Sequence, residues 1–92
     1  MSSRKMSSKK EIFELIAPEA NAVTVVGTFS DWEKNPVPLK KQKNGLWKAS
    51  IPLESGNHEY RFVVDGQWKN DPSCAQRVQN PFGEENCVRI VT

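Results

Sequence analysis

Apolar and polar residues alternate along most of this chain in short runs, a pattern typical of β-strands that bury one face. In the first run, Phe13 and Leu15 fall on one side and Glu14 falls on the other. Further runs follow at intervals of roughly 8–12 residues, separated by turn residues, as in a β-sandwich. The expected extended segments are residues 11–17, 22–29, 37–41, 46–53, 58–64, 75–80 and 86–92. Because the pattern contains no helix of three turns, it predicts an all-β antiparallel sandwich.

The inward positions of these segments hold most of the aromatic residues. Trp47 lies on the same side of its segment as Ala49, Ile51 and Leu53, so alternation assigns it to the core. The same reasoning assigns four other aromatic residues to the core: Phe13, Phe29, Tyr60 and Phe62. The short segment 37–41 contains a proline, which cannot donate to the ladder of a central strand, so this segment is predicted to be a sheet edge.

The dipeptide Asp65-Gly66 determines which way Trp68 faces. This dipeptide favours a two-residue hairpin turn, which places Val63 opposite Trp68. Directly opposed residues share a face of the sheet, so Trp68 joins Val63 and Arg61 on the face opposite to the core. A tryptophan beside an arginine on that face predicts a surface that holds a partner.

The composition is that of one small domain. A chain of 92 residues with 37% hydrophobic residues can bury one modest core. The net charge of +2 is too weak for a nucleic-acid footprint, and no apolar run reaches the roughly 18 residues of a membrane span. Residues 1–10 lack the apolar region of a secretory signal and are expected to form a disordered basic leader before a domain at 11–92. Without an export signal, the protein is expected to be cytoplasmic.

No constellation of residues typical of an enzyme or a metal site occurs in the sequence. Cys74 and Cys87 are too few for a four-ligand zinc site. In a reducing compartment both are expected to be thiols, and pairing of the last two segments would bring them close enough to join on oxidation. His58 has no second imidazole, and neighbouring acids such as Glu84 and Glu85 lie in loops rather than across a cleft. The chain is therefore predicted to be non-catalytic, without a metal or cofactor.

Three aromatic residues fall outside the predicted core. Trp32 lies in a polar loop, Trp68 on the outer face of the hairpin and Phe82 in a Pro-Phe-Gly loop. Arg61 and nearby asparagines would supply hydrogen bonds at the rim of such a platform. Two ligand classes suit it: sugar rings, whose axial C–H faces are apolar, and unstacked nucleic-acid bases.

Four segments of the chain carry a family resemblance. They are VVGTFSDW at 25–32, GNHEYRFVVDGQW at 56–68, DP at 71–72 and NPFGEEN at 80–86. Together they resemble family 48 carbohydrate-binding modules, which include the glycogen-binding domain of the AMP-activated protein kinase β subunit and N-terminal domains of isoamylases and branching enzymes. The likeness covers about residues 11–92. It implies an early-set immunoglobulin-like antiparallel β-sandwich.

The resemblance also implies roles for individual residues. In this family two tryptophans stack on consecutive glucose units of α-1,4-glucan, and they match Trp32 and Trp68. A basic residue that bonds sugar hydroxyls matches Arg61, although lysine is usual there in the kinase subunit. An apolar loop residue that reaches into the curve of the glucan matches Phe82. An asparagine of the same loop matches Asn86.

The sequence departs from the family pattern at Glu84, where a hydroxyl residue is common. The Glu84 carboxylate can still accept a hydrogen bond from a sugar hydroxyl, so it is included in the expected site. These residues together predict non-catalytic binding of an α-1,4-linked glucan such as glycogen, starch or cyclodextrin. Such a module would localise a partner enzyme or regulator to the polysaccharide.

Two other functions remain open from the sequence. The first is a protein-interaction domain whose outward aromatic residues dock a kinase, phosphatase or amylase partner without binding glucan. The second is a single-stranded nucleic-acid binder that combines the same aromatic residues with Lys40, Lys41 and Lys43. A solvated basic hairpin explains these lysines more simply, and steep salt dependence would be the mark of nucleic-acid binding. The expected partners therefore include neither nucleic acid nor membrane.

Overall fold

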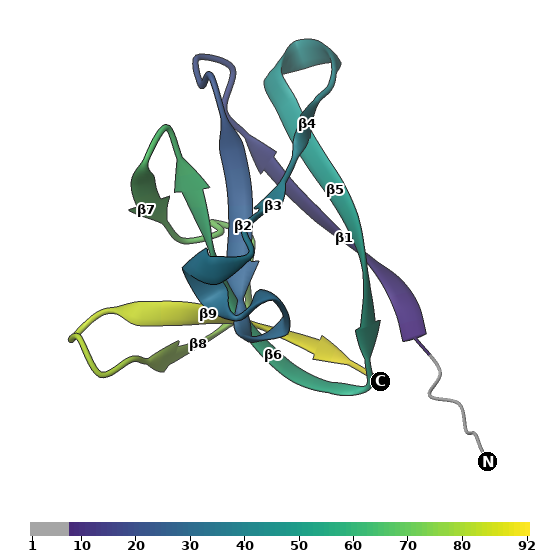
Figure 1. Ribbon diagram of the computed structural model, residues 1–92, viewed down its shortest axis with the longest axis vertical. Coiled ribbons are helices and arrows are strands. Elements are labelled where there is room, and N and C mark those ends of the chain that lie inside the picture. The colour runs from purple at the N-terminus through teal and green to yellow at the C-terminus, as the bar shows by residue number, and fades with distance from the viewer. Residues whose placement is uncertain (1–7) are drawn as a thin grey trace.

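The computed structural model describes residues 8–92, which form two antiparallel sheets packed as a sandwich (Figure 1). One sheet has the strand order β1-β5-β4, and the other has the order β3-β2-β6-β9-β8 with β7 also paired to β6. The strands are β1 (Ser8–Ile16), β2 (Val23–Gly27), β3 (Val37–Pro38), β4 (Lys40–Lys41), β5 (Leu46–Glu54), β6 (Gly56–Val64), β7 (Gln67–Lys69), β8 (Gln76–Gln79) and β9 (Glu85–Val91). Three short 3-10 turns connect them: η1 (Thr28–Ser30), η2 (Trp32–Lys34) and η3 (Lys43–Gly45). The predicted all-β antiparallel sandwich is confirmed. Within residues 8–92 no helix is long and apolar enough to cross a membrane.

The core lies between the two sheets and contains the aromatic residues that alternation placed there. Phe13, Tyr60 and Phe62 are fully buried, and Trp47 is buried with its Nε1–H donating to the carbonyl of residue 17 at 2.9 Å. The Tyr60 ring meets Phe13 and Phe62 edge-on, at centroid distances of 4.9 and 5.9 Å. Phe29 is partly buried against the same cluster. All five core assignments are confirmed.

The segment predicted as one edge strand, 37–41, divides between the two sheets. β3 pairs with β2 at the edge of one sheet, and β4 pairs with β5 at the edge of the other. Leu39 lies between them, is 5% exposed and donates its backbone N–H to the carbonyl of Val23 at 2.9 Å. The edge position is confirmed, but a single continuous strand is wrong. Leu39 is still bonded to β2, whereas the next residue, Lys40, pairs with Lys48 of β5, so the chain passes from one sheet to the other directly after Leu39.

The first strand begins earlier than expected. Ser8 already pairs with Glu54, so β1 starts three residues before the predicted boundary at residue 11. Of the expected leader, residues 1–7 lie outside the described part of the chain. At the other end, Val91 pairs with Gly56. The two ends of the described sandwich therefore lie next to the corner between β5 and β6 (Figure 1).

Cys74 and Cys87 are joined by a disulfide, so the expectation of two thiols is wrong. Cys87 is completely buried in β9, and Cys74 lies in the loop before β8. In the β8–β9 ladder Cys87 lies opposite Arg77, and the loop before β8 places the Cα of Cys74 6.0 Å from that of Cys87, within the range that a disulfide spans. The expectation of thiols rested on the compartment, which was inferred from a missing export signal and carries no information on geometry.

Candidate functional site

The hairpin between β6 and β7 places Trp68 as predicted. Val63 lies opposite Trp68, and the intervening Asp65 and Gly66 both have positive φ, at 49° and 84°. Two consecutive positive φ angles are typical of the type I′ turn, whose twist matches that of the flanking strands. Trp68 therefore lies on the outer face of the sheet, with the guanidinium carbon of Arg61 5.4 Å from the centre of its ring.

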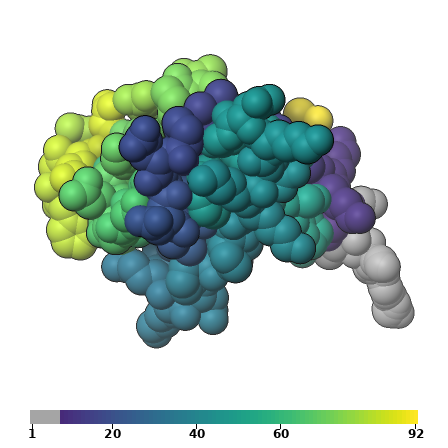
Figure 2. Space-filling view, turned by 90° about the horizontal axis from the view of Figure 1, so that it is seen from above, coloured from purple at the N-terminus to yellow at the C-terminus, as the bar shows by residue number. Residues whose placement is uncertain are grey.

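Trp32 is brought to Trp68 by an unusual stretch of backbone between β2 and β3. Asp31 and Trp32 both have φ of 56°, a left-handed conformation that is uncommon for residues other than glycine. Such conformations persist where the surroundings hold them, and they gather at functional sites. Here the Ser30 hydroxyl accepts from the Gly27 N–H at 3.1 Å and fixes the start of the segment. The segment that contains η2 projects from the body of the domain (Figure 2).

The two indole rings form one shallow platform. Their centroids are 6.5 Å apart, and the ring planes are inclined by 31° to each other. Trp68 remains 39% exposed, and Trp32 is half-buried. Two flat apolar surfaces at a shallow angle can each receive one ring of a curved chain of rings.

Arg61 lies beneath this platform rather than at its rim. Its side chain is only 10% exposed, and it forms an ion pair with the carboxylate of Glu84. Its Nε–H donates to Asn70 Oδ1 at 2.9 Å. These two hydrogen bonds engage two of the five guanidinium N–H groups, so three remain for other partners. Arg61 thus joins β6, the Trp68 ring, the end of β7 and the loop before β9.

That loop is organised by the side chain of Asn80. Its Oδ1 accepts from the backbone N–H of Phe82 at 2.9 Å and of Glu84 at 3.1 Å, and its Nδ2 donates to Asn86 Oδ1 at 3.1 Å. Asn86 in turn donates from Nδ2 to Glu59 Oε1 at 3.1 Å and is itself buried. Phe82 is left 87% exposed at the tip of the loop. Its ring therefore has little protein to pack against and is presented to solvent.

These elements enclose a groove of about 630 Å³. All six residues of the predicted site line it: Trp32, Arg61, Trp68, Phe82, Glu84 and Asn86. Sequence reasoning missed five further lining residues: Thr28, Glu33, Glu59, Pro81 and Asn80. Two local signals could have found some of them, since position 59 shares a strand face with position 61 and an Asn-Pro dipeptide marks the start of a turn.

The charges of the groove favour an uncharged ligand. Its lining contains three carboxylates, those of Glu33, Glu59 and Glu84, and one guanidinium. The lysines considered for nucleic-acid binding lie on β4 and η3 and do not line the groove. An excess of negative charge opposes a polyanion, whereas carboxylates and amides can accept and donate hydrogen bonds to hydroxyl groups. Within residues 8–92 no cluster of three or more His, Cys, Asp or Glu side chains is arranged to hold a metal ion.

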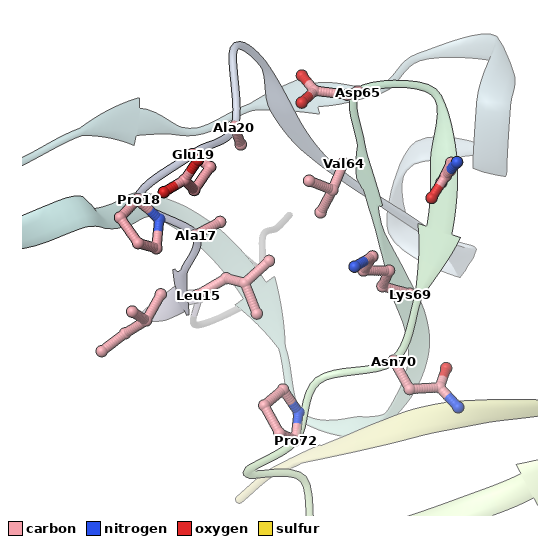
Figure 3. A pocket seen from close by; sticks show the side chains of 12 residues that line it. Leu15, Ala17, Pro18, Glu19, Ala20, Val64, Asp65, Lys69, Asn70 and Pro72 are labelled. Atoms are coloured by element: carbon pink, nitrogen blue, oxygen red, sulfur yellow. The ribbon is translucent and has the colours of Figure 1, made fainter.

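A second pocket, of about 590 Å³, lies on the opposite side of the β6–β7 hairpin (Figure 3). Leu15 and Ala17 face Val64 and Lys69 across it. Its lining residues include no aromatic ring, so it offers no surface on which a flat ligand could stack. The groove with the two tryptophans is therefore the candidate site.

The sandwich and the groove place the chain in the class of small β-sandwich domains that carry an aromatic groove on one face. Residues 13–92 match the family model described as "Glycogen recognition site of AMP-activated protein kinase", and the chain belongs to this family. It is 36% identical over 73 residues to "Protein PTST homolog 2, chloroplastic" of Arabidopsis thaliana, a match that covers 79% of this chain and 13% of the plant protein.

The other matches are also to parts of longer proteins. The chain is 43% identical over 51 residues to the "5'-AMP-activated protein kinase subunit beta-1" of Sus scrofa, which covers 55% of this chain and 39% of that sequence. It is 36% identical over 55 residues to the "1,4-alpha-glucan branching enzyme GlgB" of Nitrobacter winogradskyi, covering 60% of this chain and 8% of the enzyme. In a solved structure, the apo pullulanase of Paenibacillus barengoltzii, a similar fold covers 95% of this chain and 14% of that chain, with a TM-score of 0.57 and 23% identity. The matched part therefore makes up between 8% and 39% of the length of each of these relatives.

Proposed function

We propose that the domain binds α-1,4-linked glucan along the groove and is non-catalytic. The observation that carries this proposal is the pair of indole rings, Trp32 and Trp68, inclined by 31° with 6.5 Å between their centroids. An α-1,4 linkage makes a glucan curl, so consecutive glucose units present apolar faces that are inclined to each other. Inclined rings fit this curvature better than coplanar rings do.

The other groove residues complete the proposed site. Phe82, exposed at the tip of its loop, would lie against the apolar concave side of the curled chain. Glu84 and Glu59 would accept hydrogen bonds from sugar hydroxyls, and the free N–H groups of Arg61 would donate them. Asn86 is 5% exposed and already bonded at both ends of its amide, so its main contribution would be to fix Glu59.

The affinity expected from this arrangement is moderate. Stacking of a ring on an aromatic side chain contributes about 1–3 kcal/mol per ring, as measured for nucleic-acid bases. Two or three such contacts, reduced by the cost of ordering a flexible glucan, correspond to a Kd of roughly 10 μM to 1 mM. A module of this affinity would localise the polypeptide that carries it to glycogen or starch, where many binding sites lie close together.

Native electrophoresis in gels with and without embedded glycogen tests the proposal. The wild-type chain should be retarded by glycogen, and Trp32→Ala should remove the retardation. Ile16→Ala is a matched control, because Ile16 is a 70% exposed apolar side chain that lines the second pocket instead. If Ile16→Ala alone removed the retardation, the second pocket would be the site. If neither glycogen nor any maltooligosaccharide bound, a protein-docking role would replace the proposal.

A further inference from the structure

The disulfide lies directly behind the groove. Cys87 follows Asn86 in β9, and Cys74 lies in the loop between β7 and β8. The bridge spans 13 positions of sequence, which contain all of β8 and the whole loop that presents Phe82. It is the single covalent cross-link within residues 8–92. The bond therefore closes a ring of chain that includes one entire wall of the groove.

The disulfide also restrains the other wall of the groove, which contains Arg61 and Trp68. The segment just before Cys74 contains Asn70, which accepts the Nε–H of Arg61. Arg61 in turn supports the Trp68 ring and pairs with Glu84 on the opposite wall. A movement of the 70–74 segment would thus reach the groove through the arginine as well as through the loop that carries Phe82.

Without the bridge, both segments would still have non-covalent contacts. The Tyr60 hydroxyl donates to Asp71 Oδ2 at 2.7 Å. Burial and this hydrogen bond raise the pKa of Tyr60 far above its usual range, so the hydroxyl stays protonated and remains a donor. β8 keeps four residue pairs with β9. Cys87 belongs to the core cluster and Cys74 packs against it, but all the other members of the cluster except Val91 lie outside β8 and β9. Opening the bond is therefore expected to loosen the groove rather than to unfold the domain.

The two sulfurs differ in accessibility to solvent, and this difference determines which of them a thiolate can attack in a thiol–disulfide exchange. Cys87 is 0% exposed, whereas Cys74 is partly exposed. A thiolate of a dithiol reductant can approach the Cys74 sulfur, forming a mixed disulfide while the Cys87 sulfur leaves with the bonding electron pair and takes up a proton. The second thiol of the reductant then attacks the mixed disulfide and releases Cys74, which is protonated in turn. The reductant ends as a disulfide, and two electrons and two protons have passed to the protein.

We propose that the Cys74–Cys87 bridge is a reversible thiol–disulfide modification site, and that its reduction by a dithiol weakens the binding of glucan in the groove. The proposal rests on the proposed function of the groove. In the reduced chain the loop with Phe82 samples more conformations, and binding must order it again. We expect the Kd for β-cyclodextrin to rise roughly three- to tenfold on reduction, with glycogen retardation falling in parallel.

The experiment uses the full chain in both redox states. Thiol alkylation followed by mass spectrometry establishes the state, dithiothreitol reduces the bridge, and oxidised glutathione restores it. Titration calorimetry with β-cyclodextrin then measures the Kd in each state, with circular dichroism melts under the same conditions. Cys74→Ala is the control, because it removes the bridge while leaving the buried Cys87 in place. Its Kd should equal that of the reduced wild type and should not respond to dithiothreitol.

A second variant tests whether the effect passes through the loop. In Phe82→Ala the loop contributes less to binding, so reduction should change the Kd less than in the wild type. Equal affinity of the two redox states, or a bridge that dithiothreitol cannot open in the folded protein, would overturn the proposal while the glucan function stands. Loss of a cooperative melt on reduction would also overturn it, since the bridge would then support the whole domain. If neither state bound any α-glucan, the function and the redox proposal would fail together.

Discussion

Replacing Trp68 with alanine is expected to impair glucan binding while the sandwich stays folded. The indole is 39% exposed, and its contacts include the Trp32 ring and the Arg61 guanidinium. An aromatic pair contributes about 0.5–1.5 kcal/mol beyond its buried area, and a cation over a ring at a part-exposed site contributes about 0.5–1 kcal/mol. Loss of these two contacts is thus expected to lower the free energy of unfolding by about 1–2.5 kcal/mol, apart from the contribution of the area that the indole buries. For a domain of this size, that loss lowers the Tm by roughly 4–20 °C.

The same replacement is expected to reduce the binding free energy by a similar amount. Loss of one stacked ring removes about 1–3 kcal/mol of binding free energy, which weakens the affinity roughly 5- to 150-fold. Starting from a Kd of the order of 0.1 mM, such a loss gives a Kd of roughly 0.5–15 mM, so retardation in an affinity gel should weaken strongly or disappear. Trp68→Phe keeps a flat ring at the same position and should retain part of the retardation.

Trp47→Ala provides the opposite case. Trp47 is 7% exposed and its truncation is expected to cost about 3–5 kcal/mol. The carbonyl of Ala17 would also lose its 2.9 Å hydrogen bond, at about 1 kcal/mol. A 92-residue domain has a total stability of roughly 5–14 kcal/mol, so this variant loses a large share of it. Circular dichroism melts and glycogen gels on both variants are the assay. If Trp68→Ala unfolds the domain as badly as Trp47→Ala, the reasoning from the hairpin register is refuted.

Further outcomes are expected for the shape of the ligand, for the Asn80 side chain and for the salt concentration. β-Cyclodextrin should bind about fivefold tighter than linear maltoheptaose in titration calorimetry, because a closed ring carries a smaller ordering cost; Phe82→Ala should shrink this gap. Straight cellohexaose should give little heat, and equal affinity for it would contradict a curved-glucan site. Asn80→Ala removes the acceptor of two loop N–H groups and should weaken β-cyclodextrin binding roughly 3- to 10-fold. Asn80→Asp keeps this acceptor and should retain most of the binding. Unchanged binding in the alanine variant would show that the loop does not need these two hydrogen bonds. Raising NaCl from about 50 to 500 mM should change glycogen retardation less than about twofold, because an uncharged ligand releases no counterions; a steep fall would point to a charged ligand instead.

Local sequence signals were sufficient to predict which aromatic residues form the core and which face of the sheet carries the groove. Alternation identified the buried face of each long strand because side chains in a strand alternate between its two faces. Asp65-Gly66 defined the register of the hairpin because only certain residues tolerate the φ angles of its turn. The position of Trp68 beside Arg61 follows from that register alone.

Features that depend on contacts between distant segments could not be predicted in this way. Alternation placed Arg61 on the outer face, but it gave no information on the loop from residues 80 to 86 that covers it, and Arg61 is 9% exposed. Val26, which lies opposite Arg61 on the same face, is 1% exposed. The disulfide and the early start of β1 likewise depend on which strands pair, and no local pattern specifies that pairing.

The ladder ends have a consequence for how this domain can be built into a longer polypeptide. Ser8 pairs with Glu54 and Val91 pairs with Gly56, so both ends leave from the same corner, away from the turn between β8 and β9 (Figure 1). Neighbouring ends allow a domain to be inserted into a surface loop of a host with a small loss of chain entropy. A host attached at this corner would leave the groove facing outward. The domain can thus be joined to a larger protein, or inserted into one, at this corner with the groove left accessible.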